Sequence, residues 1–118
     1  MVFAFGCVMA GCGKAEDITG AWLAVEVGGN PVRGPTIAFE NGRVSGSGGC
    51  NRISGPAATS GSDIKLGPLI STRMFCEGKM EIEAAFIAAL EAAKTFELGA
   101  EALALKDGSG AALAKFTR

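Results

Sequence analysis

The sequence of 118 residues contains no histidine and no tyrosine. The absence of histidine removes the commonest general base and the commonest metal ligand of proteins. A Ser-His-Asp or Cys-His nucleophile is therefore excluded within this chain, and so is a histidine-ligated zinc or haem site. Charged residues make up only 19% of the chain, and a net charge of −1 gives no basic bias toward a nucleic-acid backbone. We expect no nucleic-acid partner.

The length fits a single domain. A domain of this size buries roughly two-thirds of its unfolded surface, so it can build a core without a metal. Seven Phe, one Trp and a hydrophobic share of 48% supply that core. The 4 Cys and 18 Gly then need explanations of their own.

The amino-terminal residues resemble the signal of a bacterial lipoprotein. Residues 2–10 form a short apolar run, and small residues precede Cys12 as they do in a lipobox. We predict a lipoprotein signal peptide at residues 1–11, lipidation of Cys12 and a short tether at residues 12–17. No Lys or Arg precedes the run, which a start site assigned too far downstream would explain. The alternative is a buried first strand that carries two ordinary thiols.

Two further cysteines, Cys50 and Cys76, would remain in the mature chain beside the lipidated one. In an oxidising envelope, two such cysteines in a small domain are natural disulfide partners. In the chain-entropy description of disulfides, closing this loop stabilises the fold by roughly 3.5 kcal/mol. The alternative is a pair of buried free thiols. A redox couple is disfavoured because the spacing is not Cys-x-x-Cys.

One helix is predicted at about residues 79–93. This segment is rich in Ala and Glu and contains neither Gly nor Pro. The glutamates near its start are expected to lie in solvent, where their charge suits the helix dipole. The expected apolar stripe is Met80, Ala84, Ile87 and Leu90, with Phe86 beside it, and the acidic residues are Glu77, Glu81 and Glu83.

Short alternating segments and regular turns predict several strands around this helix. Asn41 and Gly42 lie between two such segments and are a strong hairpin signal, because both residues tolerate positive φ. Residues 57–62 are expected to be a loop or a weak strand. We therefore predict an α+β fold in which an antiparallel sheet packs on one helix. The clearest strands are expected at residues 19–27, 36–40, 43–46, 63–66, 95–98, 102–106 and 112–117.

Two motifs carry a resemblance to a known family. Residues 49–55 (GCNRISG) and 71–76 (STRMFC) resemble the two motifs of the META domain family, whose bacterial members include HslJ-like heat-shock proteins. In that family a helix follows, and then terminal strands with Leu-x-Leu and a closing Phe. Residues 103–105 and Phe116 match those strands, and Trp22 matches the aromatic residue of the first strand.

This resemblance implies an antiparallel sheet that is curled toward a half barrel and packed against one helix, in a domain spanning residues 18–118. It implies an exported protein or an envelope lipoprotein, which we place at the outer membrane, facing the periplasm. Some members are linked to heat shock and to novobiocin tolerance. The resemblance implies no enzymatic activity, and we expect no cofactor and a monomer.

The expected partners are the membrane, through the lipid anchor, and an envelope protein or a lipid ligand. The function that we expect is that of a structural or binding module. The alternative is a carrier or pilot that holds a lipid or another hydrophobic ligand in the interior of the curled sheet.

The motif residues allow two interpretations. Three Gly within residues 46–49 permit either an anion cradle of backbone N–H groups or a tight strand crossing beneath the helix. Asn51 is interpreted as a structural clamp in a turn. Arg52 and Arg73 would be brought together by the disulfide, where they would bind a carboxylate or phosphate, or pair with Glu or carbonyl groups. No catalytic or metal-binding residue is assigned, and the candidate ligand contacts are Gly49, Asn51, Arg52, Gly55, Thr72 and Arg73.

Overall fold

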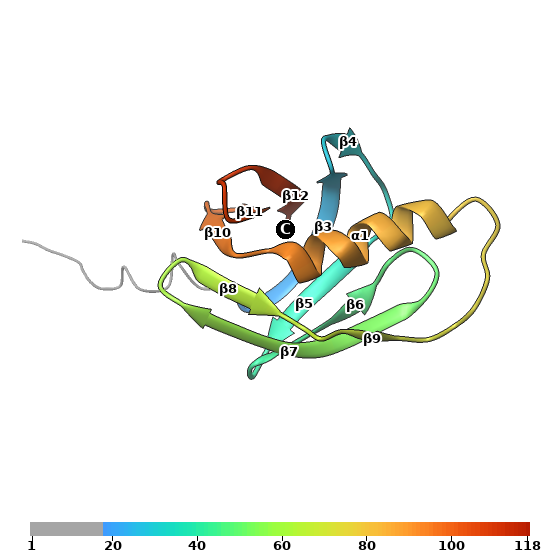
Figure 1. Ribbon diagram of the computed structural model, residues 1–118, viewed down its shortest axis with the longest axis horizontal. Coiled ribbons are helices and arrows are strands. Elements are labelled where there is room, and N and C mark those ends of the chain that lie inside the picture. Colours follow the sequence, from blue (N-terminus) through green and yellow to red (C-terminus); the bar gives the residue numbers. More distant parts are fainter. Residues whose placement is uncertain (1–17) are drawn as a thin grey trace, which may run out of the picture.

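The computed structural model describes residues 18–118. The predicted signal peptide (1–11), the tether (12–17) and the lipidation site Cys12 lie outside the described residues. The described part of the chain forms a sheet of short strands and one helix (Figure 1). The elements are β3 (Gly20–Val27), β4 (Asn30–Pro31), β5 (Thr36–Glu40), β6 (Arg43–Ser47), β7 (Arg52–Ser60), β8 (Asp63–Leu66), β9 (Ile70–Ser71), α1 (Met80–Ala92), β10 (Thr95–Leu98), β11 (Ala102–Lys106) and β12 (Ala112–Thr117).

The sheet closes on itself into a barrel of eight antiparallel strands. The order is β3, β5, β6, β7, β8, β10, β11 and β12, and β12 pairs with both β11 and β3. In the closing pair, Ala114 lies opposite Val27 and Thr117 lies opposite Leu23. The expected half barrel is therefore wrong. Closure gives hydrogen-bond partners to the two strands that would otherwise be exposed edges.

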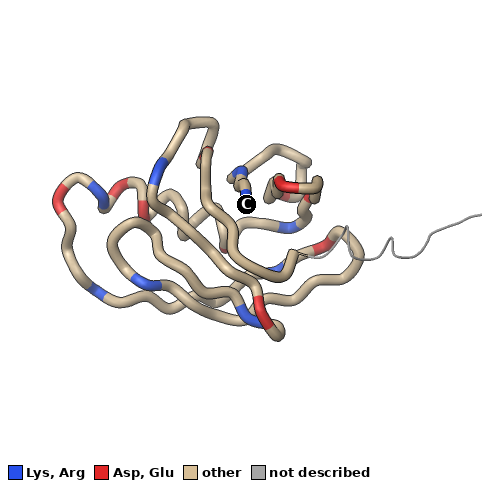
Figure 2. Tube along the Cα trace, turned by 180° about the vertical axis from the view of Figure 1, so that it is seen from behind, with Lys and Arg blue, Asp and Glu red and all other residues tan. Residues whose placement is uncertain are grey.

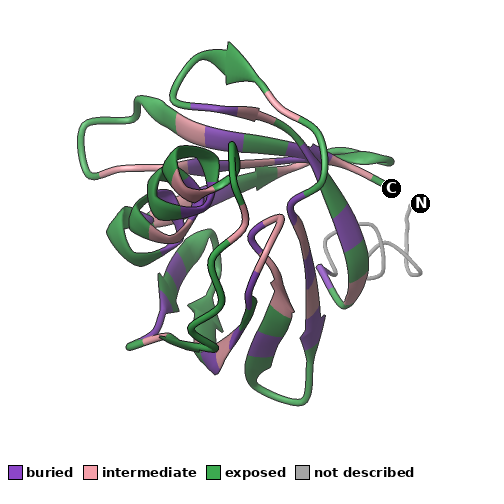
Figure 3. Ribbon diagram, turned by 90° about the vertical axis from the view of Figure 1, so that its right-hand side faces the viewer, coloured by how far each residue is buried: buried purple, intermediate pink, exposed green. Residues whose placement is uncertain are grey.

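The barrel interior is filled by large apolar side chains. Period-two alternation points one side of each strand inward, and Figure 3 shows buried and exposed residues alternating along the strands. An eight-stranded barrel is just wide enough for its own side chains. The ring centroids of Phe86 on α1 and Phe116 on β12 lie 6.1 Å apart, so the helix shares this core. The largest fully buried side chains include Trp22, Phe86, Phe116, Ile37, Leu90, Leu103, Leu105 and Val44.

The helix confirms its predicted position and most of its predicted apolar face, with Ala84 and Glu83 as the two differences. It spans Met80–Ala92, and its buried residues include Glu83, Phe86 and Leu90 at the spacing i, i+3, i+7. Ala84, expected in the apolar stripe, is exposed. Glu83, expected in solvent, is only 5% exposed. In the part of the chain that the structure describes, we find no helix with the length and apolar character needed to cross a bilayer.

The strands lie close to their predicted positions, with one difference at β7. The hairpin signal is confirmed, because Asn41 and Gly42 join β5 to β6 with φ values of 53° and 78°. Of the segment expected as a loop or weak strand, residues 57–60 belong to β7, which runs through Pro56, and Gly61 and Ser62 form the turn to β8. Pro56 has no N–H to donate to the sheet, but its carbonyl accepts a hydrogen bond from Gly67 N at 2.9 Å.

Candidate functional site

The two sequence motifs meet the helix at a buried carboxylate. Glu83, in the first turn of α1, accepts hydrogen bonds at Oε1 from Asn51 N at 2.6 Å and from Cys50 N at 3.2 Å. Its Oε2 accepts a bond from Asn51 Nδ2 at 2.6 Å. Both carboxylate oxygens are therefore engaged by the loop between β6 and β7, which holds that loop against the start of the helix.

Asn51 extends the same network to the loop between β9 and α1. Its Oδ1 accepts hydrogen bonds from Thr72 Oγ1 at 2.8 Å and from Met74 N at 2.6 Å. Its Nδ2 also donates to Met74 O at 3.0 Å. The side chain of Asn51 thus joins the first motif, the second motif and the helix, as a structural clamp would.

Two opposing effects set the ionisation of Glu83. Burial raises the pKa of its carboxyl, while the hydrogen bonds from the Asn51 side chain, the Asn51 backbone and the Cys50 backbone lower it. The hydrogen bonds outweigh burial, and the pKa of Glu83 lies below its ordinary value. The group is therefore a carboxylate at neutral pH.

The motif glycines are required either by close packing or by their backbone conformation, and Gly48 packs directly on this carboxylate. A Cβ on Gly48 would lie 2.6 Å from Glu83 Cγ, and one on Gly55 would lie 2.7 Å from Pro68 O. Gly46 is crossed by the backbone of Thr36. Gly49 has open space around it but a φ of +109°, which L side chains rarely adopt. Close packing therefore requires Gly46, Gly48 and Gly55. The N–H groups of Gly48 and Gly49 donate to Asn51 O and Ser47 Oγ, and Glu83 takes those of Cys50 and Asn51.

The disulfide fixes the two motif loops beside this network. Cys50 and Cys76 are bonded at 1.99 Å between sulfurs, with their Cα atoms 5.9 Å apart. Cys76 N also donates to Met80 Sδ at 3.5 Å, at the beginning of α1. The loop between β9 and α1 is therefore held covalently at one point and by Asn51 at another.

Arg52 and Arg73 both point to solvent near these loops. The backbone of Arg52 is bonded to Thr72 in both directions, from Arg52 N to Thr72 Oγ1 and from Thr72 N to Arg52 O, each at 3.0 Å. Neither guanidinium forms an ion pair with any carboxylate of residues 18–118. Figure 2 shows acidic and basic positions interspersed over the whole fold. Arg52 borders an open groove of about 360 Å³ between β7 and β9, with Ile70 on its other side.

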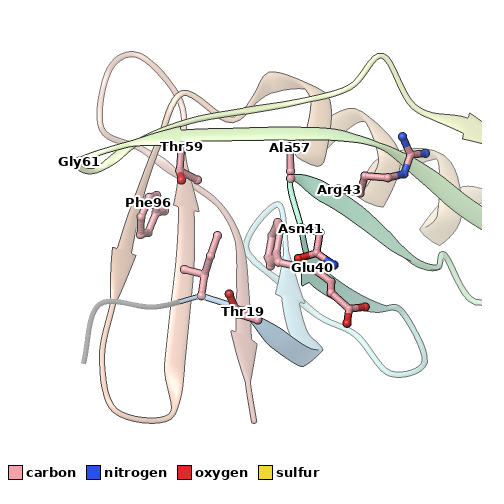
Figure 4. A pocket seen from close by; sticks show the side chains of 11 residues that line it. Thr19, Glu40, Asn41, Arg43, Ala57, Thr59, Gly61 and Phe96 are labelled. Atoms are coloured by element: carbon pink, nitrogen blue, oxygen red, sulfur yellow. The ribbon is translucent and has the colours of Figure 1, made fainter. Parts of the chain in front are cut away.

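A second hollow lies at one end of the barrel and holds about 190 Å³. Figure 4 shows Phe96 and Thr59 on one side of it and Asn41 and Glu40 on the other. Typical small-molecule sites are roughly 300–1,000 Å³. This hollow is therefore too small to hold an acyl chain.

Sequence reasoning missed two features of this region. The first is Glu83, whose signal was its spacing of three and seven residues from Phe86 and Leu90, on the buried helix face. The second is a set of exposed apolar side chains inside and beside the second motif. Ile70 is 69% exposed, Met74 58% and Phe75 78%.

Three solved structures share the fold of this chain. The first, a protein solved by NMR, is 25% identical, with a TM-score of 0.67, over 85% of this chain and 89% of the other. The second, an NMR structure from Burkholderia xenovorans, is 24% identical, with a TM-score of 0.66, over 86% of this chain and 82% of the other. The third, a crystal structure of a DUF4847 family protein from Bacteroides vulgatus, is 18% identical, with a TM-score of 0.65, over 85% of this chain and 92% of the other.

No curated protein matches this sequence. The META domain family matches residues 16–118, which include both motifs, the helix and the whole barrel. That family is not a known enzyme family. This chain belongs to the META domain family.

Proposed function

We propose that this chain is a non-enzymatic envelope lipoprotein of the HslJ type. It is a structural or binding module that is anchored in the outer membrane by lipid on Cys12, faces the periplasm and contributes to stress or novobiocin tolerance. The observation that carries the proposal is the bond between Cys50 and Cys76. Disulfides persist in oxidising compartments such as the periplasm and are rare in the cytosol. The bond therefore fits an exported protein.

The packing of the barrel favours a rigid module over a carrier. Large aromatic side chains occupy the interior: Trp22, Phe86 and Phe116 are each at most 2% exposed. A carrier for lipid needs an interior volume that these side chains already fill. We therefore place the working surface of the protein on its outside, where the motif loops are held.

The anchor is tested by mass spectrometry of protein extracted from the membrane fraction. The chain should begin at Cys12 and carry a mass increase of lipid size on that residue. Cys12→Ser should abolish the increase, whereas Cys7→Ser, in the same segment, should leave it unchanged. An unmodified chain that retains Met1 would contradict the anchor.

The tolerance role is tested separately in cells. A strain that lacks the gene should grow less well than its parent with novobiocin, and the parent gene should restore growth. Restoration by the Cys12→Ser gene would show that the anchor is dispensable for this role. Equal growth of the deleted and parent strains under novobiocin and under heat would contradict the stress role.

A further inference from the structure

We propose that the outer surface around the second motif binds membranes that carry anionic phospholipid. This surface consists of Arg52, Ile70, Arg73, Met74 and Phe75, and we call it the tip surface. The inference rests on the proposed envelope function, for which it names the ligand class and a second point of contact. Figure 1 shows the loop between β9 and α1 extending past the barrel at one end of the molecule.

The tip surface presents apolar side chains that the fold does not use. Phe75 is 78% exposed and Met74 58%, and they are neighbours in the loop between β9 and α1. Ile70, which is 69% exposed, lies on β9 just before that loop. Burial of such side chains in the interfacial region of a bilayer is favourable in proportion to the apolar area removed from water.

The backbone beneath these side chains is held in place. Met74 N and Met74 O are both bonded to the side chain of Asn51, at 2.6 and 3.0 Å. Cys76 is bonded to Cys50. The loop is therefore fixed with its apolar side chains outward, and little conformational entropy is lost when they enter a membrane.

The charges on the tip surface favour anionic lipid. Arg52 and Arg73 are exposed and have no ion pair with a carboxylate of residues 18–118. A guanidinium binds phosphate oxygens bidentately, as it would in a lipid headgroup. Glu77 and Lys79 follow on the same loop and offset one another in charge. Because the whole chain has a net charge of only −1, local placement of cations decides the attraction.

Apolar and cationic groups on one fixed loop suit a lipid interface, where the side chains enter the acyl boundary and the guanidinium groups remain among the phosphates. A protein partner would instead require a pocket shaped for Phe75. The experiment below separates these two occupants, because vesicles offer the lipid chemistry without any protein pocket.

The test mixes vesicles with the full chain carrying Cys12→Ser and measures how much protein sediments with them. This variant keeps its disulfide but has no lipid anchor. Vesicles contain either phosphatidylglycerol with phosphatidylethanolamine or phosphatidylcholine alone. We expect stronger binding to the phosphatidylglycerol vesicles, and added salt should weaken that binding. The variant Met74→Ser/Phe75→Ser should lose binding, and Arg52→Gln/Arg73→Gln should weaken it by roughly fivefold per cation.

Matched variants control for residues outside the tip surface. Leu23→Ser removes an apolar side chain that is 46% exposed on β3, and Arg33→Gln/Lys65→Gln removes two exposed cations elsewhere. Both should bind like the parent, and circular dichroism should show the same fold for all variants. Equal binding of the Met74→Ser/Phe75→Ser variant and its parent would overturn the proposal, as would no binding of the parent. Either result would leave the lipid on Cys12, measured separately, unaffected.

Discussion

Asn51 and Glu83 form a two-point clamp across the fold. Asn51 donates to one carboxylate oxygen through its backbone N–H and to the other through its side-chain amide, each at 2.6 Å. These residues lie 32 positions apart in the sequence, on the loop before β7 and in the first turn of α1. A buried carboxylate here stabilises the junction because it is hydrogen-bonded at both oxygens.

The variant Glu83→Gln should destabilise the domain by about 2–3 kcal/mol. The new amide NH₂ group would face N–H donors of Cys50 and Asn51, which need an acceptor. Urea unfolding followed by circular dichroism measures the change. Glu81→Gln, at an exposed position in the same helical turn, should change the free energy of unfolding by less than about 0.5 kcal/mol. Equal stability of the two variants would mean that the clamp contributes little.

A reversed pair tests the direction of the side-chain bond. Asn51→Asp alone places a second carboxylate against Glu83, which should destabilise the fold through repulsion. The double variant Asn51→Asp/Glu83→Gln restores a donor facing an acceptor. It should be more stable than the sum of the two single changes by about 0.5–3 kcal/mol. A strictly additive double-mutant cycle in urea unfolding would argue against a direct interaction.

The lowered pKa of Glu83 gives the domain a pH dependence with a definite sign. Because the pKa is below 4.5 in the folded state, the unfolded chain binds the proton more readily. The stabilisation is complete above that ordinary value and is lost as the pH falls through the folded-state pKa. Unfolding measured across an acid series should therefore show a steeper loss for the parent than for Glu83→Gln.

Asp107 needs a control in that experiment, since hydrogen bonds from the Ser109 side chain and from backbone N–H groups also lower its pKa. The comparison should be repeated in an Asp107→Asn background. If the parent and Glu83→Gln proteins lose stability in parallel below pH 4.5 in both backgrounds, Glu83 is not the titrating group.

Gly48→Ala should destabilise the domain by about 1–3 kcal/mol, because the new methyl group would displace Glu83 from its donors. The matched control is Gly99→Ala, where the nearest atoms lie at 3.9 Å and the backbone φ is ordinary. Thermal unfolding should show a clear loss for the first variant and little change for the second. Similar unfolding temperatures would mean that the crossing has room for a side chain.

Removal of the disulfide in the variant Cys50→Ser/Cys76→Ser should cost roughly 3.5 kcal/mol of stability. The network around Asn51 should still hold the loop, so the folded state should persist with the same circular dichroism spectrum. A reducing agent should lower the unfolding midpoint of the parent and leave that of the variant unchanged. A parent protein that is insensitive to reductant would contradict a stabilising bond.

Local signals predicted the local elements of this fold. Asn41 and Gly42 specify their hairpin because the turn needs two residues that accept positive φ, and that requirement involves no distant contact. The helix, predicted at 79–93, is found at Met80–Ala92, because composition alone favours it there. The pairing of Cys50 with Cys76 followed from elimination among four cysteines once export was assumed.

Distant contacts explain the parts that could not be predicted. The alternating residue patterns of β3 and β12 mark both segments as strands. Nothing in either segment specifies that the two strands pair and close the barrel. The burial of Glu83 depends on N–H groups of the loop before β7, which a helical pattern does not contain. Its acidic character favoured a solvent position, and its tertiary partners reversed that preference.

The pairing of β12 with both β11 and β3 has a consequence for biosynthesis. β12 comes last in the sequence among the strands of the barrel, so during synthesis the earlier strands emerge before the one that joins them. Until it arrives, β3 and β11 each expose a row of unpaired backbone groups, which are the sites where strands of separate chains associate. The barrel therefore cannot close before β12 is present, and a chain without β12 would leave the edges of β3 and β11 unpaired at once.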